Sequence, residues 1–288
     1  MCRYVAYLGG PLYLRDLVYE PANSLINQAS DALESRTRIN ADGFGLGWYC
    51  RDHGAKPAVF KEITPAWSNA NLHSLADCIS SKCIVAHVRA ATGRDPVSRS
   101  NCHPFRHGPL LWMHNGDIPG RGRLFRNVVS AADDDLVARI RGNTDSELAF
   151  VLFCTRLPSR VGLTFSPDEL VVAMEKTIRK IAEWQAKAGD RRPLALNFCV
   201  TNGRSLVATR FARGDVTPPT LHYCTGGRFV CENGMCRVEE RSHDSRCVII
   251  ASERLSEDPR WVTVERDSVV VVGEDLGVRV KKLEVAEG

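Results

Sequence analysis

Two capped segments in the middle of the chain decide the fold: TDSELAFVLFCTRL at 144–157 and SPDELVVAMEKTIRKIAEWQAKAG at 166–189. Each opens on a capping box, with Thr144 or Ser166 at the N-cap and a glutamate three residues later, and each therefore predicts a helix start. A proline directly after Ser166 suits the first turn of a helix. We expect two consecutive helices, of which the second carries an apolar face.

Short apolar segments on both sides of this helix pair are typical of strands. The expected strands are 3–8, 42–49 continuing into 57–61, 83–88, 110–113, 194–200, 205–211, 222–224 and 246–251, with two more near the C-terminus. One short helix is expected at 71–79. Strands, then two helices, then strands again favour sheets covered by helices over alternating βαβ units, so we predict one compact α+β domain spanning 1–288.

Composition excludes several classes of protein. The chain has 288 residues, a net charge of +4, 44% hydrophobic residues and 25% charged residues. This ordinary balance excludes a disordered chain and a dedicated nucleic-acid binder. Its apolar runs are far shorter than the roughly 20 residues that span a bilayer, and no signal peptide opens the sequence. We therefore expect a cytoplasmic protein with no membrane or nucleic-acid partner.

Eleven cysteines are scattered along the chain without a CxxC pair. An odd number at such spacings does not suit a disulfide framework, and it predicts reduced thiols in a reducing compartment. Cys231 and Cys236 are five residues apart but have no His or Cys partner nearby, so a zinc site is disfavoured.

Cys2 is the cysteine with a possible chemical role. A small side chain at position 2 usually allows the initiator Met to be removed, which would leave a thiol and a free α-amine on one residue. An α-amine titrates near neutral pH. A nucleophile that carries its own general base can attack an amide carbonyl without a separate histidine. The alternative is a second-position cysteine without any role.

Attack on an amide also needs donors for the oxyanion of the tetrahedral intermediate. Asn115 and Gly116 close the apolar segment 110–113, where the Asn115 amide and the Gly116 N–H could supply two hydrogen bonds. Asn-Gly is also a common hairpin dipeptide, so a plain turn is the competing interpretation.

Two charged residues are candidates for holding a substrate that has both charges of an amino acid. Arg89 follows the expected strand 83–88, and a guanidinium at a strand end can bind a carboxylate through two parallel hydrogen bonds. Asp145 lies in the first turn of an expected helix, where it could bind an α-ammonium. Arg89 could equally be a structural ion-pair partner, and Asp145 could be there because acidic residues favour helix N-termini.

Seven motifs follow one another along the chain: MCR (1–3), DGFGLGWY (42–49), AHVRAATG (86–93), NCHPF (101–105), HNGDI (114–118), NTDSE (143–147) and ASERL (251–255). Together they resemble the class II glutamine amidotransferase family, whose members begin with a catalytic cysteine. The flanking motifs are similar to those of its stand-alone branch, which includes the ergothioneine-pathway γ-glutamyl hydrolase and the fungal glutathione-degrading amidotransferase subunit.

The resemblance implies an N-terminal nucleophile (Ntn) hydrolase fold, a four-layer αββα sandwich of two antiparallel sheets. It also implies that Cys2 is the nucleophile and that Asn115 and Gly116 form the oxyanion hole. Arg89 would hold the α-carboxylate of a γ-glutamyl group and Asp145 its α-amine, with Thr92 lining the site.

The leading hypothesis is hydrolysis of γ-glutamyl amide bonds, which releases glutamate through a Cys2 γ-glutamyl thioester and needs no metal or organic cofactor. One alternative is a glutaminase subunit that delivers ammonia to, or works only with, a synthetase or peptidase-like partner. Another is a binding module that has kept the pocket and lost the activity.

Overall fold

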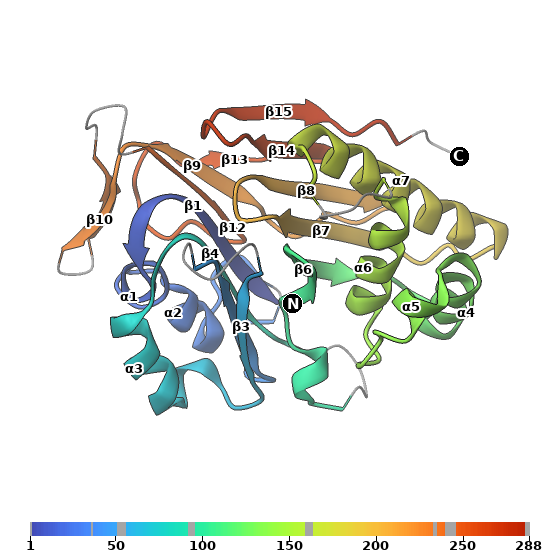
Figure 1. Cartoon of the computed structure of the whole chain (residues 1–288), viewed down its shortest axis with the longest axis horizontal. Coiled ribbons are helices and arrows are strands. Elements are labelled where there is room, and N and C mark those ends of the chain that lie inside the picture. The colour runs from blue at the N-terminus through green and yellow to red at the C-terminus, as the bar shows by residue number, and fades with distance from the viewer. Residues whose placement is uncertain are drawn as a thin grey trace.

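The computed structural model describes residues 2–35, 37–50, 56–91, 96–158, 164–232, 235–239 and 246–285. In this part of the chain the strands form two large sheets and one separate hairpin, with helices on the outer faces of both sheets (Figure 1). None of the described helices is long and apolar enough to cross a membrane.

The first sheet has seven strands in the order β13-β9-β12-β1-β4-β2-β3. Their bounds are β1 (Arg3–Tyr13), β2 (Phe44–Trp48), β3 (Ala58–Glu62), β4 (Ser80–Val88), β9 (His222–Gly226), β12 (Cys247–Ala251) and β13 (Val262–Thr263). The N-terminal strand β1 therefore lies in the middle of the sheet, antiparallel to both β4 and β12.

The second sheet has six strands in the order β15-β14-β8-β7-β6-β5. Their bounds are β5 (Phe105–His107), β6 (Leu110–Asp117), β7 (Leu194–Thr201), β8 (Leu206–Arg213), β14 (Ser268–Val272) and β15 (Val278–Lys282). Neighbouring strands are again antiparallel.

Helices cover the outer face of each sheet and leave the inner faces to pack on each other. Those on the first sheet are α1 (Leu14–Val18), α2 (Leu25–Ser30) and α3 (Ala70–Cys78), and those on the second are α4 (Arg121–Ala131), α5 (Asp134–Val137), α6 (Asp145–Arg156) and α7 (Pro167–Lys187). One short 3₁₀ helix, Ala66–Ser68, lies between β3 and α3, and another, Arg99–Asn101, lies between β4 and β5. The predicted four-layer αββα sandwich is confirmed.

Alternation along β1 shows how one strand contributes to two apolar cores. Tyr4, Ala6 and Leu8 pack in the cluster between the sheets, whereas Val5 and Tyr7 pack in the cluster under the helices of the first sheet. Successive side chains of a strand point to opposite faces, so a strand buried on both sides is apolar at nearly every position. This burial fixes the chain directly after Cys2.

The structure excludes the turn interpretation of Asn115 and Gly116. Both lie inside β6, where Asn115 is paired with Asn197 and Gly116 with Leu196 of β7. The hairpin-turn interpretation is therefore wrong, because β6 continues to Asp117 instead of ending at position 113.

The two predicted capping boxes differ in detail. At α7 both halves are present, since the Ser166 side chain accepts from Glu169 N and the Glu169 side chain accepts from Ser166 N. At α6 the Thr144 side chain caps the helix, but the Glu147 carboxylate accepts from the backbone N–H groups of Arg141 (2.9 Å) and Gly142 (2.7 Å). Glu147 therefore holds the preceding loop, and the prediction of a full box was wrong there.

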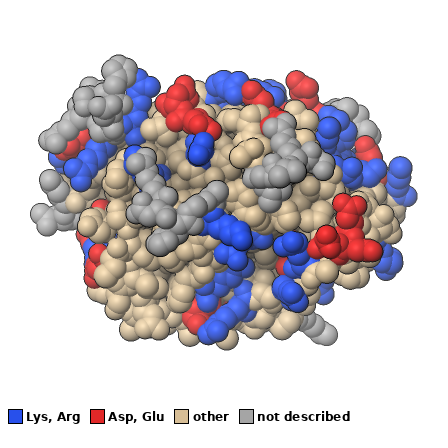
Figure 2. Space-filling model, in the orientation of Figure 1, with Lys and Arg blue, Asp and Glu red and all other residues tan. Residues whose placement is uncertain are grey.

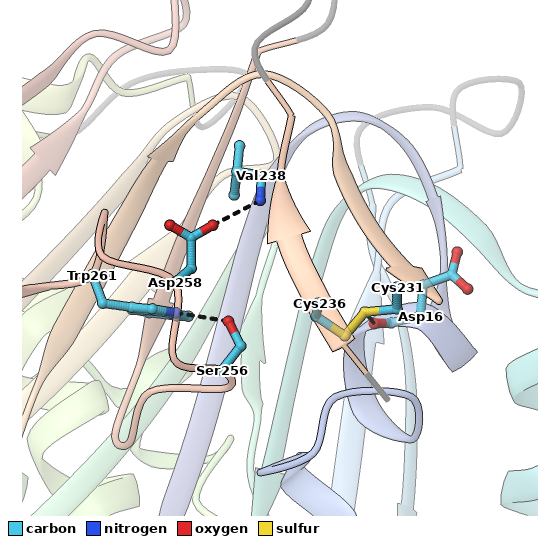
Figure 3. Close-up of a disulfide and its surroundings, with 7 residues drawn as sticks. All are labelled: Asp16, Cys231, Cys236, Val238, Ser256, Asp258 and Trp261. Atoms are coloured by element: carbon cyan, nitrogen blue, oxygen red, sulfur yellow. Dashed lines mark hydrogen bonds between the residues drawn. A yellow bond between two sulfur atoms is a disulfide. The ribbon is translucent and has the colours of Figure 1, made fainter. Parts of the chain in front are cut away.

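Strands β10 (Phe229–Glu232) and β11 (Met235–Val238) form a hairpin that the sequence analysis did not predict. Cys231 and Cys236 lie directly opposite each other in it, with Cα atoms 4.1 Å apart, and are joined by a disulfide (Figure 3). The expectation of reduced thiols is wrong for this pair, because the cross-strand register places the two sulfurs together. The other nine cysteines are free.

Candidate active site

Cys2 directly precedes the central strand β1 and is half-buried. Its Sγ lies 3.4 Å from the backbone N of Ala90, which donates to it, and 3.5 Å from the Ala90 carbonyl. Burial raises the pKa of the Cys2 thiol, and the hydrogen bond from Ala90 and the positive charges of Arg89 and Arg3 act against this rise. The thiol is thus placed at the end of β4, within the electrostatic reach of two guanidinium groups.

A buried ion pair fixes the backbone at Cys2. Arg3 Nε lies 2.7 Å from Glu253 Oε1, both side chains are fully buried, and Arg3 Nη1 donates to the Cys2 carbonyl at 2.9 Å. The Glu253 carboxylate also accepts from the backbone N–H groups of Leu33 (2.9 Å) and Glu34 (3.0 Å). The sequence analysis assigned no role to Glu253, which here joins three distant segments around the candidate nucleophile.

Asn115 is connected to β1 through a serine that the sequence analysis also missed. The Ser252 hydroxyl accepts from Tyr4 N at 3.1 Å and from Asn115 Nδ2 at 3.5 Å. Asn115 is buried, and its Oδ1 has no hydrogen-bond partner among the described residues. A buried polar atom without a partner is uncommon and indicates a place for a ligand or water.

Gly116 occupies a position that no larger residue fits. A Cβ atom built there would lie 1.9 Å from the backbone oxygen of Ala195 on β7. The close approach of β6 and β7 at this point therefore requires glycine directly after Asn115.

Arg89 follows β4 and its side chain is buried. Its backbone is fixed on both sides, because its N–H donates to Gly43 O at 2.8 Å and its carbonyl accepts from Asp42 N at 2.9 Å. The Asp42 carboxylate accepts from Ala91 N at 2.8 Å, which holds the start of the following loop. Within the described chain the Nη1 of Arg89 has no acceptor. A buried guanidinium with an unused donor can bind a carboxylate.

Asp145 is the first residue of α6, and its two oxygens are held in place by backbone groups. Oδ2 accepts from Ile118 N and Oδ1 from Ser146 N, both at 2.8 Å. Asp145 lines a pocket of about 640 Å³ together with Asp117. Burial and the negative charge of Asp145 raise the pKa of Asp117. Arg121 and Arg192 line the same pocket, so its described lining carries two acidic and two basic side chains.

Three buried histidines lie beside these residues. The rings of His87 and His103 stack with centroids 4.0 Å apart, and His114 Nδ1 is 2.9 Å from the Ser146 hydroxyl. Burial lowers the pKa of all three, that of His87 to about 3, so they are neutral at pH 7. They are core histidines, and no cluster of three metal-ligating side chains occurs in the part of the chain that the structure covers.

The structure thus places Cys2 next to Arg89 through Ala90, and Asn115 reaches β1 through Ser252, which accepts from Tyr4 N. Gly116 is adjacent to Asn115 on β6, and Asp145 is connected to β6 through Ile118. Thr92 lies outside the described residues.

Comparison with known proteins gives a matching family and similar proteins. Residues 26–283 match the glutamine amidotransferases class-II family. The chain is 36% identical to the probable glutamine amidotransferase DUG3 of Saccharomyces cerevisiae, over 94% of this chain and 82% of that protein. It is 29% identical to the γ-glutamyl-hercynylcysteine sulfoxide hydrolase of Mycolicibacterium smegmatis, over 94% of this chain and 99% of that protein.

Solved structures share the fold. A glutamine aminotransferase class-II domain protein of Silicibacter pomeroyi superimposes with a TM-score of 0.68 at 21% identity, over 99% of this chain and 100% of that one. The glutamine phosphoribosylpyrophosphate amidotransferase of Bacillus subtilis superimposes with a TM-score of 0.59 at 13% identity, over 99% of this chain and 50% of that one. From its sequence match and its two stacked sheets, the chain belongs to the class-II glutamine amidotransferase family.

Proposed function

We propose that this protein hydrolyses γ-glutamyl amide bonds with Cys2 as the nucleophile. One observation carries the proposal: the half-buried Cys2 thiol accepts a hydrogen bond from Ala90, the residue after the buried Arg89, whose Nη1 has no acceptor among the described residues. This free donor suits a substrate carboxylate. The Asn115 amide nitrogen makes one hydrogen bond, to the Ser252 hydroxyl at 3.5 Å, and has a second N–H that can donate to a substrate carbonyl.

The reaction begins after removal of Met1, which frees the α-amine of Cys2. This amine accepts the thiol proton, and Sγ attacks the γ-carbonyl carbon. The Asn115 side-chain amide and the Gly116 N–H stabilise the negative oxygen of the tetrahedral intermediate. The C–N bond then breaks, and the α-amine gives its proton to the leaving amine or ammonia. Water attacks the γ-glutamyl thioester, releasing glutamate and restoring the thiol.

The γ-glutamyl end of the substrate is held by opposite charges. Arg89 binds its α-carboxylate, Asp145 binds its α-ammonium, and Thr92 is a third residue of the proposed site. The backbone hydrogen bonds that fix Asp42, Arg89 and Asp145 keep these groups in place before substrate arrives. Such preorganisation lowers the cost of orienting the substrate.

Two relatives support the γ-glutamyl bond as the target, since one is named a glutamine amidotransferase and the other a γ-glutamyl-hercynylcysteine sulfoxide hydrolase. The nine free cysteines favour a cytoplasmic location, where thiols stay reduced. Fractionation of cells that contain a tagged protein tests this location.

Glutamate release tests the proposed activity. The purified protein is incubated with L-glutamine and a panel of γ-glutamyl peptides that includes glutathione, and intact-mass spectrometry establishes the N-terminal residue. We expect release by the wild type, none by Cys2→Ala, and normal release by Cys78→Ala, which removes an exposed free thiol. Turnover by Cys2→Ala, or no release from any substrate by protein that begins at Cys2, contradicts the proposal.

A further inference from the structure

A second pocket, of about 400 Å³, lies between β3, β5, α5 and α6. Its floor is apolar and includes the buried side chains of Phe105, Phe150 and Val151. Its charged lining is strongly basic, with five cationic side chains and one buried carboxylate: Lys61, Arg99, Arg106, Arg139, Arg141 and Glu147. Ser100, His107, Leu136 and Cys154 complete the lining. The pocket is in the size range of small-molecule sites.

Lys61 lies deepest among these cations. Its ammonium nitrogen is 4.7 Å from the centre of the Phe105 ring, and burial lowers its pKa to about 8. Over the described residues, no carboxylate lies within ion-pair distance of Lys61. The buried Glu147 is already bound to the backbone N–H groups of Arg141 and Gly142. A largely buried cation without a counter-ion is costly, and an anionic ligand would remove this cost.

The arginines of the wall differ in how far they are already paired. Arg99 binds Glu62 at 2.6 Å, and Arg106 Nη1 donates to the Pro57 carbonyl at 3.1 Å. In the described chain neither Arg139 nor Arg141 has a side-chain hydrogen bond or ion pair. Figure 2 shows Lys and Arg side chains gathered in the lower middle of this face, the region in which Figure 1 places the segment between β4 and β5.

We propose that this pocket binds a small organic anion in which a phosphate or carboxylate group is attached to an apolar ring or chain. The anionic group contacts Lys61, Arg139 and Arg141, and the apolar part lies on Phe105 and Phe150. Guanidinium and ammonium groups form charge-assisted hydrogen bonds with both kinds of anion. The aromatic floor favours an aromatic or aliphatic body over an inorganic ion.

The pocket is separate from the site at Cys2. Lys61 on β3 is paired with Gly45 on β2, and β4 lies between β2 and β1. Three strand spacings of about 4.8 Å place Lys61 on the order of 14 Å from β1. A row of aromatic rings connects the two sites, since Phe105 is 4.7 Å from His103, which stacks on His87. A ligand on Phe105 therefore lies at the end of a row of aromatic rings that reaches His87 on β4, two residues before Arg89.

A phosphate-bearing aldehyde, pyridoxal 5′-phosphate, is a direct probe of this pocket. The neutral Lys61 amine attacks the aldehyde carbon, water leaves, and the resulting imine is reduced to a stable secondary amine by added borohydride. Peptide mass spectrometry then measures labelling at each lysine. We expect Lys61 to be labelled ahead of the exposed Lys56. Equal labelling of Lys61 and Lys56 would overturn the proposal.

Variants and competitors complete the test. In Arg139→Gln/Arg141→Gln we expect labelling of Lys61 to fall about tenfold, because two charged contacts at a partly exposed wall are lost. The matched control Arg279→Gln removes an exposed arginine that is paired with Asp168. In this variant Lys61 should be labelled to the same extent as in the wild type. Circular dichroism checks that both variants are folded. Unchanged labelling of the double variant contradicts the proposed site.

Two competitors with the same ring distinguish the anionic group. Protection of Lys61 by phenyl phosphate alone assigns a phosphate ligand, and protection by benzoate alone assigns a carboxylate. Protection by both supports the shared anionic chemistry. If neither compound protects Lys61, the proposal fails.

Discussion

At the scale of single residues, Asn115 has the most specific expected effect. Asn115→Ala removes the side-chain amide that we propose as a donor to the oxyanion in the transition state, so we expect kcat to fall roughly 10²–10³-fold with little change in KM. Steady-state glutamate release measures both constants. The exposed Asn71→Ala is the matched control and should retain full activity. A KM effect of the same size as the kcat effect would assign Asn115 to ground-state binding instead.

Gly116 should affect stability before it affects chemistry. A Cβ at this position would lie 1.9 Å from the Ala195 carbonyl oxygen, so Gly116→Ala must push β6 away from β7. We expect a loss of roughly 1–3 kcal/mol in the free energy of unfolding, measured by urea denaturation. Gly122→Ala, in α4 with no atom within 4 Å of the added Cβ, should be neutral or stabilising. Equal stability of the two variants would contradict the close strand contact.

At the scale of elements, the Arg3–Glu253 pair joins the start of β1 to the end of β12. Glu253→Leu leaves the guanidinium buried without a counter-ion and should lower the free energy of unfolding by roughly 3–5 kcal/mol. In Arg3→Met/Glu253→Leu, urea denaturation should show that part of the lost free energy of unfolding returns relative to Glu253→Leu. The recovery is partial because the buried charge is gone but the backbone N–H groups of Leu33 and Glu34 still lack their acceptor. Arg279→Gln, which breaks an exposed pair, should cost less than about 1 kcal/mol.

Elements with local signals could be predicted from the sequence, and those that depend on distant pairing could not. The caps at Thr144 and Ser166 and the apolar segments around them were sufficient for α6, α7 and most of the strands. The hairpin that carries the Cys231–Cys236 disulfide could have been predicted, because the sequence between its strands is Asn233-Gly234, a dipeptide typical of two-residue hairpin turns, and the sequence analysis did not use this signal. The continuation of β6 through Asn115 depends on pairing with β7, about 80 residues further along the chain.

The same distinction applies to the candidate site. Cys2, Arg89, Asn115 and Asp145 occur in motifs that can be recognised one at a time. Glu253 acquires its role through a partner 250 positions away, and this relation appears once both strands are placed in one sheet.

At the scale of the whole molecule, the buried histidines should make the protein sensitive to acid. The pKa of His87 is lowered to about 3 in the folded chain, whereas an unfolded histidine has a pKa near 6.5. Below about pH 6.5 the unfolded chain therefore binds a proton that the folded chain does not. The free energy of unfolding should fall by up to about 1.4 kcal/mol per pH unit for each such histidine, from about pH 6.5 down towards pH 3.

Urea denaturation at pH 7, 6 and 5 measures this slope. His87→Gln should make it shallower by about 1 kcal/mol per pH unit, since one of the titrating groups is removed. Asn71→Gln, at an exposed position and without a titrating group, should leave it unchanged. The same slope in the wild type and His87→Gln would show that His87 is protonated in the folded protein.

The central place of β1 has a consequence for the order in which the protein matures. A chain is made from its N-terminus, so Cys2 is synthesised first, whereas β12, which flanks β1 and carries Ser252 and Glu253 at its end, is synthesised more than 240 residues later. Nearly the whole polypeptide is therefore synthesised before Ser252 and Glu253 can contact β1 next to Cys2, the proposed nucleophile. During that interval Met1 is accessible to an aminopeptidase. The contacts that position the Cys2 thiol form only after translation is almost complete.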